Sequence, residues 1–445
     1  MSEKKKTIAV IFGGASPEYE VSLSSAYSVI SNMSTDKYCV VKIGITRNGE
    51  WYIFKGADLD IKNDTWCMQK KCKPIFPSPN PLRAGFYIME NGDDKQNLDQ
   101  SNWEFLEVDA VFPLVHGKNG EDGRLQGIFE LANIPIIGCD TFASALCMDK
   151  YRAKQIVAAA GVSVPKSRVI KKHELNALEH ALKAEVAAEA ITVTKASVLK
   201  ELDLGIDYPL FVKPLCAGSS FGISRVSEHE DLIPAIKEAF IYDDEVIIEA
   251  AIEGFEVGCA IVGQDDDLLI GEIDEIQLSD HFFDFHEKYH LTNSAIHVPA
   301  RIDKEKAASI KDIAKTIYTA LGCSGFARVD CFLTPTGEII FNEVNTIPGF
   351  TDHSRFPNML KGKGYSFSEI IDLIIDKSHS PESNQTFSSP RVASKTFLST
   401  QSISGSRAAS DTLLSTRSFP SSGVDSEALI STQIFSSSKT ASEIL

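Results

Sequence analysis

The chain has 445 residues, of which 43% are hydrophobic and 24% charged, as in a globular protein with roughly two to four domains. Its formal net charge of −17 argues against nucleic acid as the main partner, because phosphate backbones bind basic surfaces. Nine scattered cysteines without a CxxC pair indicate neither a disulfide framework nor a zinc site. No apolar stretch resembles a signal peptide or membrane helix, so we expect no membrane partner and a cytoplasmic location.

The N-terminal residues have the pattern of a nucleotide-binding α/β fold. A buried strand is expected over Thr7–Phe12, followed by a glycine-containing loop, a helix over Val21–Asn32 and a strand over Cys39–Ile45. The loop lacks GxGxxG spacing, so it does not predict a dinucleotide site. Glu20, near the helix start, is placed either to hold a substrate ammonium or simply to complement the helix dipole.

A third strand of this fold is expected over Val108–Val115, after a stretch at 55–105 that we interpret as a variable excursion. The strand ends in a glycine-rich loop that begins with His116. Open α/β sheets bind ligands at the carboxyl ends of their strands, so His116 is a candidate site residue. A purely structural histidine is the alternative.

The middle of the chain is predicted to be helical. Helices are expected over Leu125–Ala132 and Ala143–Ala160, and Lys150 lies inside the second one. A single lysine on a helix is normally a solvated charge. The stretch Lys172–Leu204 has a helical composition interrupted by Ile-Thr-Val-Thr, and we interpret part of it as an insertion.

A glycine- and serine-rich loop follows the strand Tyr208–Lys213. Such a loop offers backbone N–H groups and hydroxyls to phosphates, and Lys213 adds a point charge, although an ordinary hairpin tip is the alternative. The next two strands, Glu245–Glu249 and Phe255–Val262, are expected to pair with each other.

Three further segments follow, and a hairpin described below lies between the last two of them. Residues Ser279–Ile296 are polar and aromatic and predict a long loop. A helix is expected over Lys304–Leu321. After about Ile375 the composition becomes serine-rich without periodicity, which predicts a disordered tail.

A β-hairpin is predicted between the last two segments, with its turn at Thr334–Gly337. If Thr334 pairs with Gly337, Arg328 lies opposite Glu343. Because side chains alternate between the faces of a strand, one face would then carry four polar side chains, namely Arg328, Asp330, Glu343 and Asn345. Oxygen ligands beside a guanidinium suit Mg²⁺ and nucleotide phosphates, whereas a solvated hairpin face is the alternative.

Taken together, these features resemble the ATP-grasp fold and, more narrowly, the D-alanine–D-alanine ligase family. The matching motifs occur in the family's order from residue 7 to about 375, and too many match for chance. They are Gly13-Gly14-x-Ser16-x-x-Tyr-Glu20-Val-Ser, His116-Gly-x-x-Gly-Glu-Asp-Gly123, Met148-Asp-Lys150, Phe211-Val-Lys-Pro214, Gly218-Ser-Ser-x-Gly222, Lys288-Tyr289, Arg328-x-Asp330 and Asn342-Glu-x-Asn345-Thr-x-Pro-Gly349.

The resemblance implies an α/β fold, with a Rossmann-like parallel sheet followed by a two-domain ATP-grasp fold of α+β type and a disordered tail. The expected parts are an N-terminal substrate domain (1–125), a central ATP-grasp subdomain (126–240, with the insertion at 172–204), a C-terminal ATP-grasp subdomain with the metal site (241–375) and the tail (376–445).

The resemblance also implies a role for each candidate residue. For ATP these are Lys150, Lys213, Ser219, Ser220, Glu249, Ile252 and Glu256, and for two Mg²⁺ ions, with Mn²⁺ as an alternative, they are Asp330, Glu343 and Asn345. The first D-alanine is assigned to Glu20, Ser219 and Tyr289, and the second amino acid to His116, Lys288, Ser354 and Arg355. An oxyanion site is assigned to Arg328 and the backbone N–H of Gly349.

The implied reaction is ATP-dependent formation of D-Ala-D-Ala through a D-alanyl phosphate, for peptidoglycan precursors, by a homodimer. Arg355 stands where an aliphatic residue is common, and with Tyr19 and Ser354 it resembles the D-alanine–D-serine ligases of vancomycin-resistance type. D-Ser is therefore a close competitor of D-Ala as the second substrate. Another ATP-grasp enzyme and an inactive ATP-binding module are the remaining alternatives.

Overall fold

A computed structural model of the chain describes residues 4–68, 71–89, 103–177, 180, 204–218, 221–278 and 294–378. All of these residues belong to one compact unit, delimited as Met1–Phe387. The predicted loop Ser279–Ile296 and the predicted tail lie almost wholly outside the described residues, as does most of the predicted insertion Lys172–Leu204. Within the described ranges, none of the helices combines the length and the apolar character that crossing a membrane requires.

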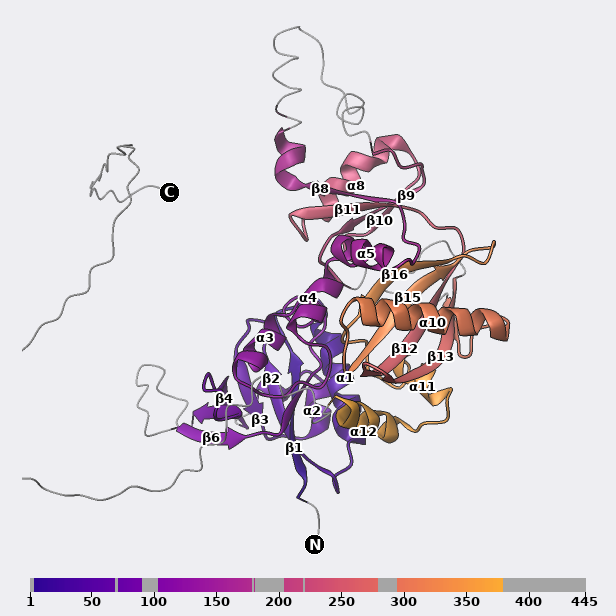
Figure 1. Ribbon diagram of the computed structural model, residues 1–445. Helices are drawn as coiled ribbons and strands as arrows, with labels where there is room; N and C mark the ends of the chain where they lie inside the picture. Colours follow the sequence, from indigo (N-terminus) through magenta and orange to yellow (C-terminus); the bar gives the residue numbers. More distant parts are fainter. Residues whose placement is uncertain are drawn as a thin grey trace, which may run out of the picture. The chain divides into compact units, whose positions relative to one another are not determined.

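The N-terminal part forms a seven-stranded sheet with the order β6-β5-β4-β3-β2-β1-β7 (Figure 1). Its strands are β1 (Lys6–Gly13), β2 (Tyr38–Ile45), β3 (Trp51–Phe54), β4 (Cys72–Pro77), β5 (Gly85–Met89), β6 (Trp103–Glu107) and β7 (Ala110–Pro113). Among these strands only β2, β1 and β7 run parallel. The expected parallel sheet is thus correct for these three strands at one end of the sheet and wrong for the other four, because β3 pairs antiparallel with β2 and the stretch 55–105 extends the sheet with further antiparallel strands.

Helix α1 (Tyr19–Asn32) follows β1 and packs against it. Its buried residues recur every three or four positions, as in Tyr19, Ser22 and Leu23, which is the spacing of a single helix face. The other helices of this part are α2 (Asp58–Lys62), the 3₁₀ helix η1 (Trp66–Met68) and α3 (Arg124–Leu131).

The helix expected over Ala143–Ala160 is two helices, α4 (Thr141–Met148) and α5 (Lys150–Ala159). Asp149 separates them with an extended backbone, and its carboxylate accepts a hydrogen bond from the backbone N–H of Arg152 at 2.8 Å. An aspartate that caps a helix in this way competes with continuation of the preceding one. The break places Lys150 at the first position of α5 rather than in mid-helix.

A four-stranded sheet with the order β10-β9-β11-β8 comes next. Its strands are β8 (Ser167–Lys171), β9 (Leu210–Pro214), β10 (Ser224–Val226) and β11 (Glu245–Ala250), accompanied by η3 (His229–Asp231) and α8 (Leu232–Ala239). The predicted pairing of Glu245–Glu249 with Phe255–Val262 is wrong, because β11 pairs with β8 and β9 and the following strand enters another sheet.

That sheet has five strands in the order β14-β13-β12-β15-β16, all antiparallel. The strands are β12 (Phe255–Gln264), β13 (Asp267–Leu278), β14 (Ser294–His297), β15 (Phe326–Leu333) and β16 (Ile339–Asn345). Helix α10 (Lys304–Ala320) crosses one face of the sheet and packs on β12, β13 and β15 (Figure 1). The last described helices are α11 (Arg355–Lys361) and α12 (Phe367–Lys377).

Aromatic side chains join the N-terminal sheet to the predicted hairpin. Phe112 of β7 meets Phe326 of β15 and Phe350 at ring-centroid distances of 5.8 and 6.2 Å, both edge-on. Each of these three side chains is fully buried. Edge-to-face pairs add to the free energy gained by burial. This contact sets the loop after β16 against the carboxyl end of the N-terminal sheet.

Candidate active site

The hairpin of β15 and β16 brings the four predicted polar residues to one face. Arg328 lies opposite Asn345, and Asp330 lies opposite Glu343. The predicted register is therefore wrong by two residues. Leu333 pairs with Ile339 beyond a longer turn, and a bulge between Asp330 and Cys331 adds the second residue. Two single-residue shifts restore the alternation, so the same side chains still share a face.

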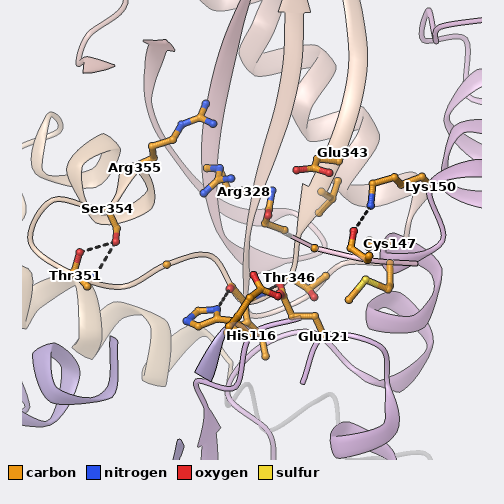
Figure 2. A pocket seen from close by; sticks show the side chains of 18 of the residues that line it. His116, Glu121, Cys147, Lys150, Arg328, Glu343, Thr346, Thr351, Ser354 and Arg355 are labelled. Atoms are coloured by element: carbon orange, nitrogen blue, oxygen red, sulfur yellow. Dashed lines mark hydrogen bonds between the residues drawn. The ribbon is translucent and has the colours of Figure 1, made fainter. Parts of the chain in front are cut away.

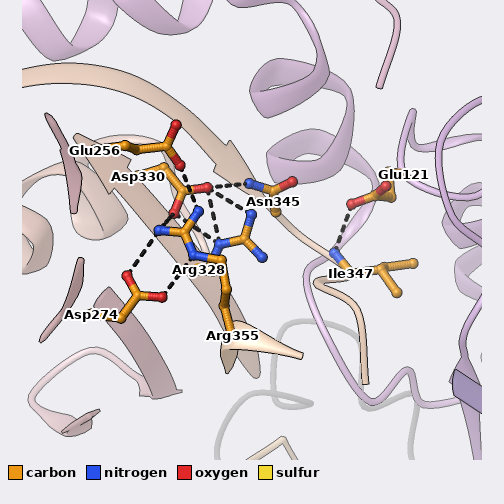
Figure 3. Close-up of polar contacts among 8 residues, drawn as sticks. All are labelled: Glu121, Glu256, Asp274, Arg328, Asp330, Asn345, Ile347 and Arg355. Atoms are coloured by element: carbon orange, nitrogen blue, oxygen red, sulfur yellow. Dashed lines mark hydrogen bonds and ion pairs between the residues drawn. The ribbon is translucent and has the colours of Figure 1, made fainter. Parts of the chain in front are cut away.

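Asp330 is a fully buried carboxylate held by N–H donors (Figure 3). It accepts hydrogen bonds from Arg328 Nε at 2.8 Å and Nη2 at 2.7 Å, and from Asn345 Nδ2 at 2.9 Å. Arg355 Nη2 lies 3.3 Å from Oδ1 of Asp330, the oxygen that also accepts from Arg328 Nε. A buried carboxylate of this kind requires such compensation, since an unpaired charge is unstable away from water.

Arg355 is itself buried and also contacts two further carboxylates, those of Asp274 and Glu256. Its Nε and Nη2 donate to the two oxygens of Asp274 at 2.7 and 2.9 Å, a bidentate arrangement, and Nη1 donates to Glu256 at 2.5 Å (Figure 3). Asp274 is fully buried on β13. The side chain of Arg355 is thereby fixed, although it starts α11 on another element.

The residue types at the hairpin fit a magnesium site. Among the described residues, no three His, Cys, Asp or Glu side chains are arranged to hold a metal ion. The predicted set instead has two carboxylates, Asp330 and Glu343, directly opposite each other, with the amide of Asn345 on the same face. Mg²⁺ is commonly held by one or two carboxylates together with substrate phosphates, so this donor set suits a nucleotide-bound ion.

A pocket opens beside this face (Figure 2). Arg328, Glu343 and Asn345 line it from the hairpin, and the loop after β16 and the start of α11 contribute Gly349, Ser354 and Arg355. Other parts of the chain contribute Glu18, His116, Glu121, Cys147, Met148, Lys150 and Gly218. Positive side chains on one wall face carboxylates on another, which is an arrangement for a substrate that carries both charges.

His116 and Glu121 fix the loop after β16 to the N-terminal sheet. His116 Nδ1 donates to the carbonyl of Ile347 at 2.8 Å, and its Nε2 lies 3.0 Å from the Ser25 hydroxyl. Glu121 accepts from the backbone N–H groups of Ile347 and Gly117 at 2.9 and 2.8 Å. The predicted site histidine thus lines the pocket, but its two ring nitrogens are already engaged in the structure.

Burial changes the protonation of both side chains. It lowers the pKa of His116 to about 4, and the hydrogen bond to Ile347 offsets this only in part. Burial also raises the pKa of Glu121 to about 8, with the charges of Glu18 and Glu343 adding to the rise and the N–H donors opposing it. At neutral pH the histidine is therefore neutral, and Nδ1 carries its proton.

The structure does not bring Glu20 into the pocket. Its side chain is 69% exposed and pairs with Arg47 at the surface. The pocket carboxylate is Glu18, which precedes α1 and is 6% exposed. Its carboxylate oxygen lies so close to Gly117 that a Cβ there would approach it within 1.7 Å, and the left-handed backbone of Gly117 (φ 67°) also favours glycine. The sequence held a signal for this, because Glu18 precedes Ser22 by four residues and so continues the buried face of α1, whereas Glu20 does not.

Two predicted lysines occupy neighbouring elements. Lys150 donates to the carbonyl of Ala217 at 2.6 Å and lines the pocket. Lys213 of β9 donates to Glu249 of β11 at 2.7 Å. Ile252, predicted to lie near the adenine, is half-buried in the loop after β11. Four further predicted residues, Ser219, Ser220, Lys288 and Tyr289, lie outside the described residues.

Comparisons with known proteins agree with these features. Family models match residues 7–139, as D-ala D-ala ligase N-terminus, and residues 158–376, as D-ala D-ala ligase C-terminus. A protein of Streptomyces coelicolor named putative D-alanine–D-lactate ligase is 40% identical over 370 residues, which are 82% of this chain and 95% of that protein. The D-alanine–D-alanine ligase of Caldicellulosiruptor bescii is 38% identical over 372 residues, 83% of this chain and 94% of that protein.

Solved structures give a similar result. The crystal structure of VanG D-Ala:D-Ser ligase from Enterococcus faecalis is 50% identical in sequence, with a TM-score of 0.72. The match covers 84% of this chain and all of that one.

The buried His116 predicts a pH-dependent stability. Its folded pKa of about 4 lies below the ordinary value of 6.5, so the unfolded chain takes up the proton first as the pH falls. The free energy of unfolding should therefore be unaffected above about pH 6.5 and should fall by about 2 kcal/mol on going to pH 5 through this group. Urea unfolding at pH 7.5 and pH 5.0 measures the change.

The control is His116→Asn, whose amide can replace the Nδ1 donor. Its stability should fall less between the two pH values than that of the wild type. Glu121 has a raised pKa and acts in the opposite direction, but it is present in both proteins and cancels in the comparison. Equal pH dependence of wild type and variant would contradict this account of His116.

Proposed function

The chain belongs to the D-alanine–D-alanine ligase family, and from this premise we propose that it joins the carboxyl group of D-alanine to the amine of a second D-amino acid, coupled to conversion of ATP into ADP and phosphate. The product with D-alanine in both positions is D-Ala-D-Ala, a building block of peptidoglycan precursors. A homodimer in the cytoplasm remains the prediction from the family resemblance.

The observation that carries the proposal is the single pocket in which Lys150, Arg328 and Glu343 meet Glu18. Activating a carboxylate with ATP requires cations near the phosphates and carboxylates for a metal ion. Amino-acid substrates additionally require an anion for their ammonium group. The pocket supplies each of these groups from a different element.

We assign roles to the residues as follows. Lys150 and Lys213 would contact ATP phosphates, with Glu249, Ile252 and Glu256 near the nucleoside. Glu18, in place of Glu20, would hold the ammonium of the first D-alanine, because it is the buried carboxylate that lines the pocket. The roles of Ser219, Ser220, Lys288 and Tyr289 come from the resemblance alone.

Asp330, Glu343 and Asn345 would hold Mg²⁺. When bound, the ion neutralises phosphate oxygens and so makes the terminal phosphorus easier to attack. In the structure Arg328 and Asn345 donate to Asp330 and keep its charge balanced. The same contacts orient the carboxylate on the face where the other two ligands lie.

The chemistry follows from the charges. An oxygen of the D-alanine carboxylate attacks the γ-phosphorus and ADP leaves, giving a D-alanyl phosphate. The neutral amine of the second amino acid then attacks the carbonyl carbon, the amine loses a proton, and phosphate leaves as the amide bond forms. Arg328 and the backbone N–H of Gly349 would stabilise the negative oxygen of the tetrahedral intermediate.

The function can be tested by measuring ADP and dipeptide formation. The proposal predicts ADP release that requires Mg²⁺ and D-alanine together, with one dipeptide formed per ADP. An inactive ATP-binding module would release no ADP. A different ATP-grasp ligase would release ADP with another carboxylate and not with D-alanine, and either result would overturn the proposed function.

Replacement of Arg328 tests the oxyanion assignment. Arg328→Ala should fold but lose most of its dipeptide synthesis, with kcat lower by roughly 10²–10³, the usual effect of removing one oxyanion donor. Arg328→Lys is the matched control, because it keeps the positive charge beside Asp330 and should retain more activity. Circular dichroism checks the fold of both. Near-normal turnover by Arg328→Ala would refute the role.

D-Serine is a second candidate for the second substrate, and Arg355 favours it. The guanidinium lines the pocket and is held in place by Asp274. A site with such a donor can favour a hydroxyl group, whereas an apolar pocket rejects one only weakly, by about 10²-fold. VanG, with which this chain shares 50% sequence identity, is a D-Ala:D-Ser ligase.

The choice between the substrates can be measured with D-alanine alone and with added D-serine. The test uses the double variant Arg355→Met with Asp274→Asn, which removes both members of the buried ion pair. If Arg355 selects serine, the ratio of kcat/KM for D-serine to kcat/KM for D-alanine should be about 10- to 100-fold lower in this variant than in the wild type. Arg355→Lys, which keeps the charge but loses the bidentate contact, is the control. No mixed product from the wild type would exclude D-serine.

A further inference from the structure

Lys154 is a buried lysine that belongs to none of the motifs above. It lies on α5 one turn after Lys150, and its side chain is 1% exposed. The ammonium lies 2.8 Å from one oxygen of Glu249 on β11 and donates to the carbonyl of Asn342 on β16, also at 2.8 Å. A fully buried lysine is rare unless it is paired, so a specific reason for its charge is expected.

The other oxygen of Glu249 accepts from Lys213 at 2.7 Å. One carboxylate therefore serves two lysines, and this cluster of Lys154, Glu249 and Lys213 has an excess positive charge. Burial alone would raise the pKa of Glu249, but the two lysines bring it down to about 2, so the carboxylate is ionised. The side chain of Lys213 is 11% exposed, against 1% for Lys154, so Lys213 is the more accessible of the two lysines.

We propose that Lys154 is a positioning residue for nucleotide binding: it keeps Glu249 neutralised, so that Lys213 can turn from the carboxylate to an ATP phosphate. The inference rests on the proposed function and adds a residue that neither the motifs nor the pocket contains.

The reason is electrostatic. If Lys154 were absent, the ammonium of Lys213 and the carboxylate of Glu249 would form a neutral ion pair with no excess charge. A phosphate would then have to break that pair and leave a buried carboxylate uncompensated beside another anion, which is strongly unfavourable. With Lys154 in place, Glu249 keeps one partner when Lys213 leaves.

The contact with Asn342 allows a second, purely structural reading. Asn342 precedes the proposed metal ligand Glu343, so Lys154 also links α5 and the four-stranded sheet to the metal-bearing hairpin. If this link were its whole role, removing Lys154 would loosen the site for every part of the nucleotide. Removing the charge of Glu249 as well would then make binding worse, not better.

Binding of ATP and of adenosine to the full-length protein, measured by isothermal titration calorimetry, separates the two readings. Lys154→Met should weaken ATP binding by about tenfold or more, which corresponds to about 1.4 kcal/mol, and leave adenosine binding within about threefold of wild type. KM for D-alanine should likewise change little. Lys154→Met with Glu249→Gln should bring the ratio of ATP affinity to adenosine affinity back to within about threefold of wild type, because Lys213 then has no carboxylate to neutralise, and any loss of a Glu249 contact with the nucleoside weakens ATP and adenosine alike.

Lys315→Met, which removes an exposed lysine from α10, is the matched control and should bind ATP like the wild type. If Lys154→Met does not fold, the comparison of Glu249→Gln with the double variant replaces it, and their ATP affinities should agree within about threefold. Equal weakening of ATP and adenosine, or no recovery of the affinity ratio in the double variant, overturns the inference. Absence of ADP formation by the wild type would instead overturn the proposed function.

Discussion

The pairing of β15 with β16 is the constraint on which the rest of the site depends. Cross-strand neighbours in an antiparallel hairpin point to the same side, so the register alone decides which polar side chains meet. Here it brings Asp330 opposite Glu343 and Arg328 opposite Asn345. A shift by one residue would turn half of this set into the core beneath α10. The bulge beside Asp330 is therefore part of the site, because it restores the alternation that the longer turn disturbs.

Burying so many charges is possible because each has a partner. Asp330 is shared by Arg328 and Arg355, and Glu249 is shared by Lys154 and Lys213. In both clusters the carboxylate has two cations from different elements. A substrate anion or a metal ion can then take one partner without leaving a bare charge in a medium of low polarity. The proposed ligand-binding side chains of both clusters are thus already paired with opposite charges before the ligands bind.

The sequence predicted the polar face of the hairpin and the strand that ends in Lys213, because each depends on local periodicity or on turn residues. It failed where two local readings were nearly equivalent, or where the partner of a strand is distant in the sequence, as for β11. The helix over Ala143–Ala160 has no proline or glycine to break it, and only the cap at Asp149 divides it. Glu18 and Glu20 lie on either side of the start of α1, and only in the structure does Glu18 lie against Gly117 in the pocket while Glu20 pairs with Arg47 at the surface.

The proposed roles of Arg355 and Asp330 are physically coupled. The Arg355 guanidinium spans from Asp274 and Glu256 to within 3.3 Å of Asp330, so the side chain proposed to select the second amino acid is also a partner of the proposed metal ligand. Changing it for another substrate changes the charge beside that ligand as well. An aliphatic residue at this position would leave Asp274, a fully buried carboxylate, without its bidentate partner. A change of specificity at this position therefore requires a second change on β13.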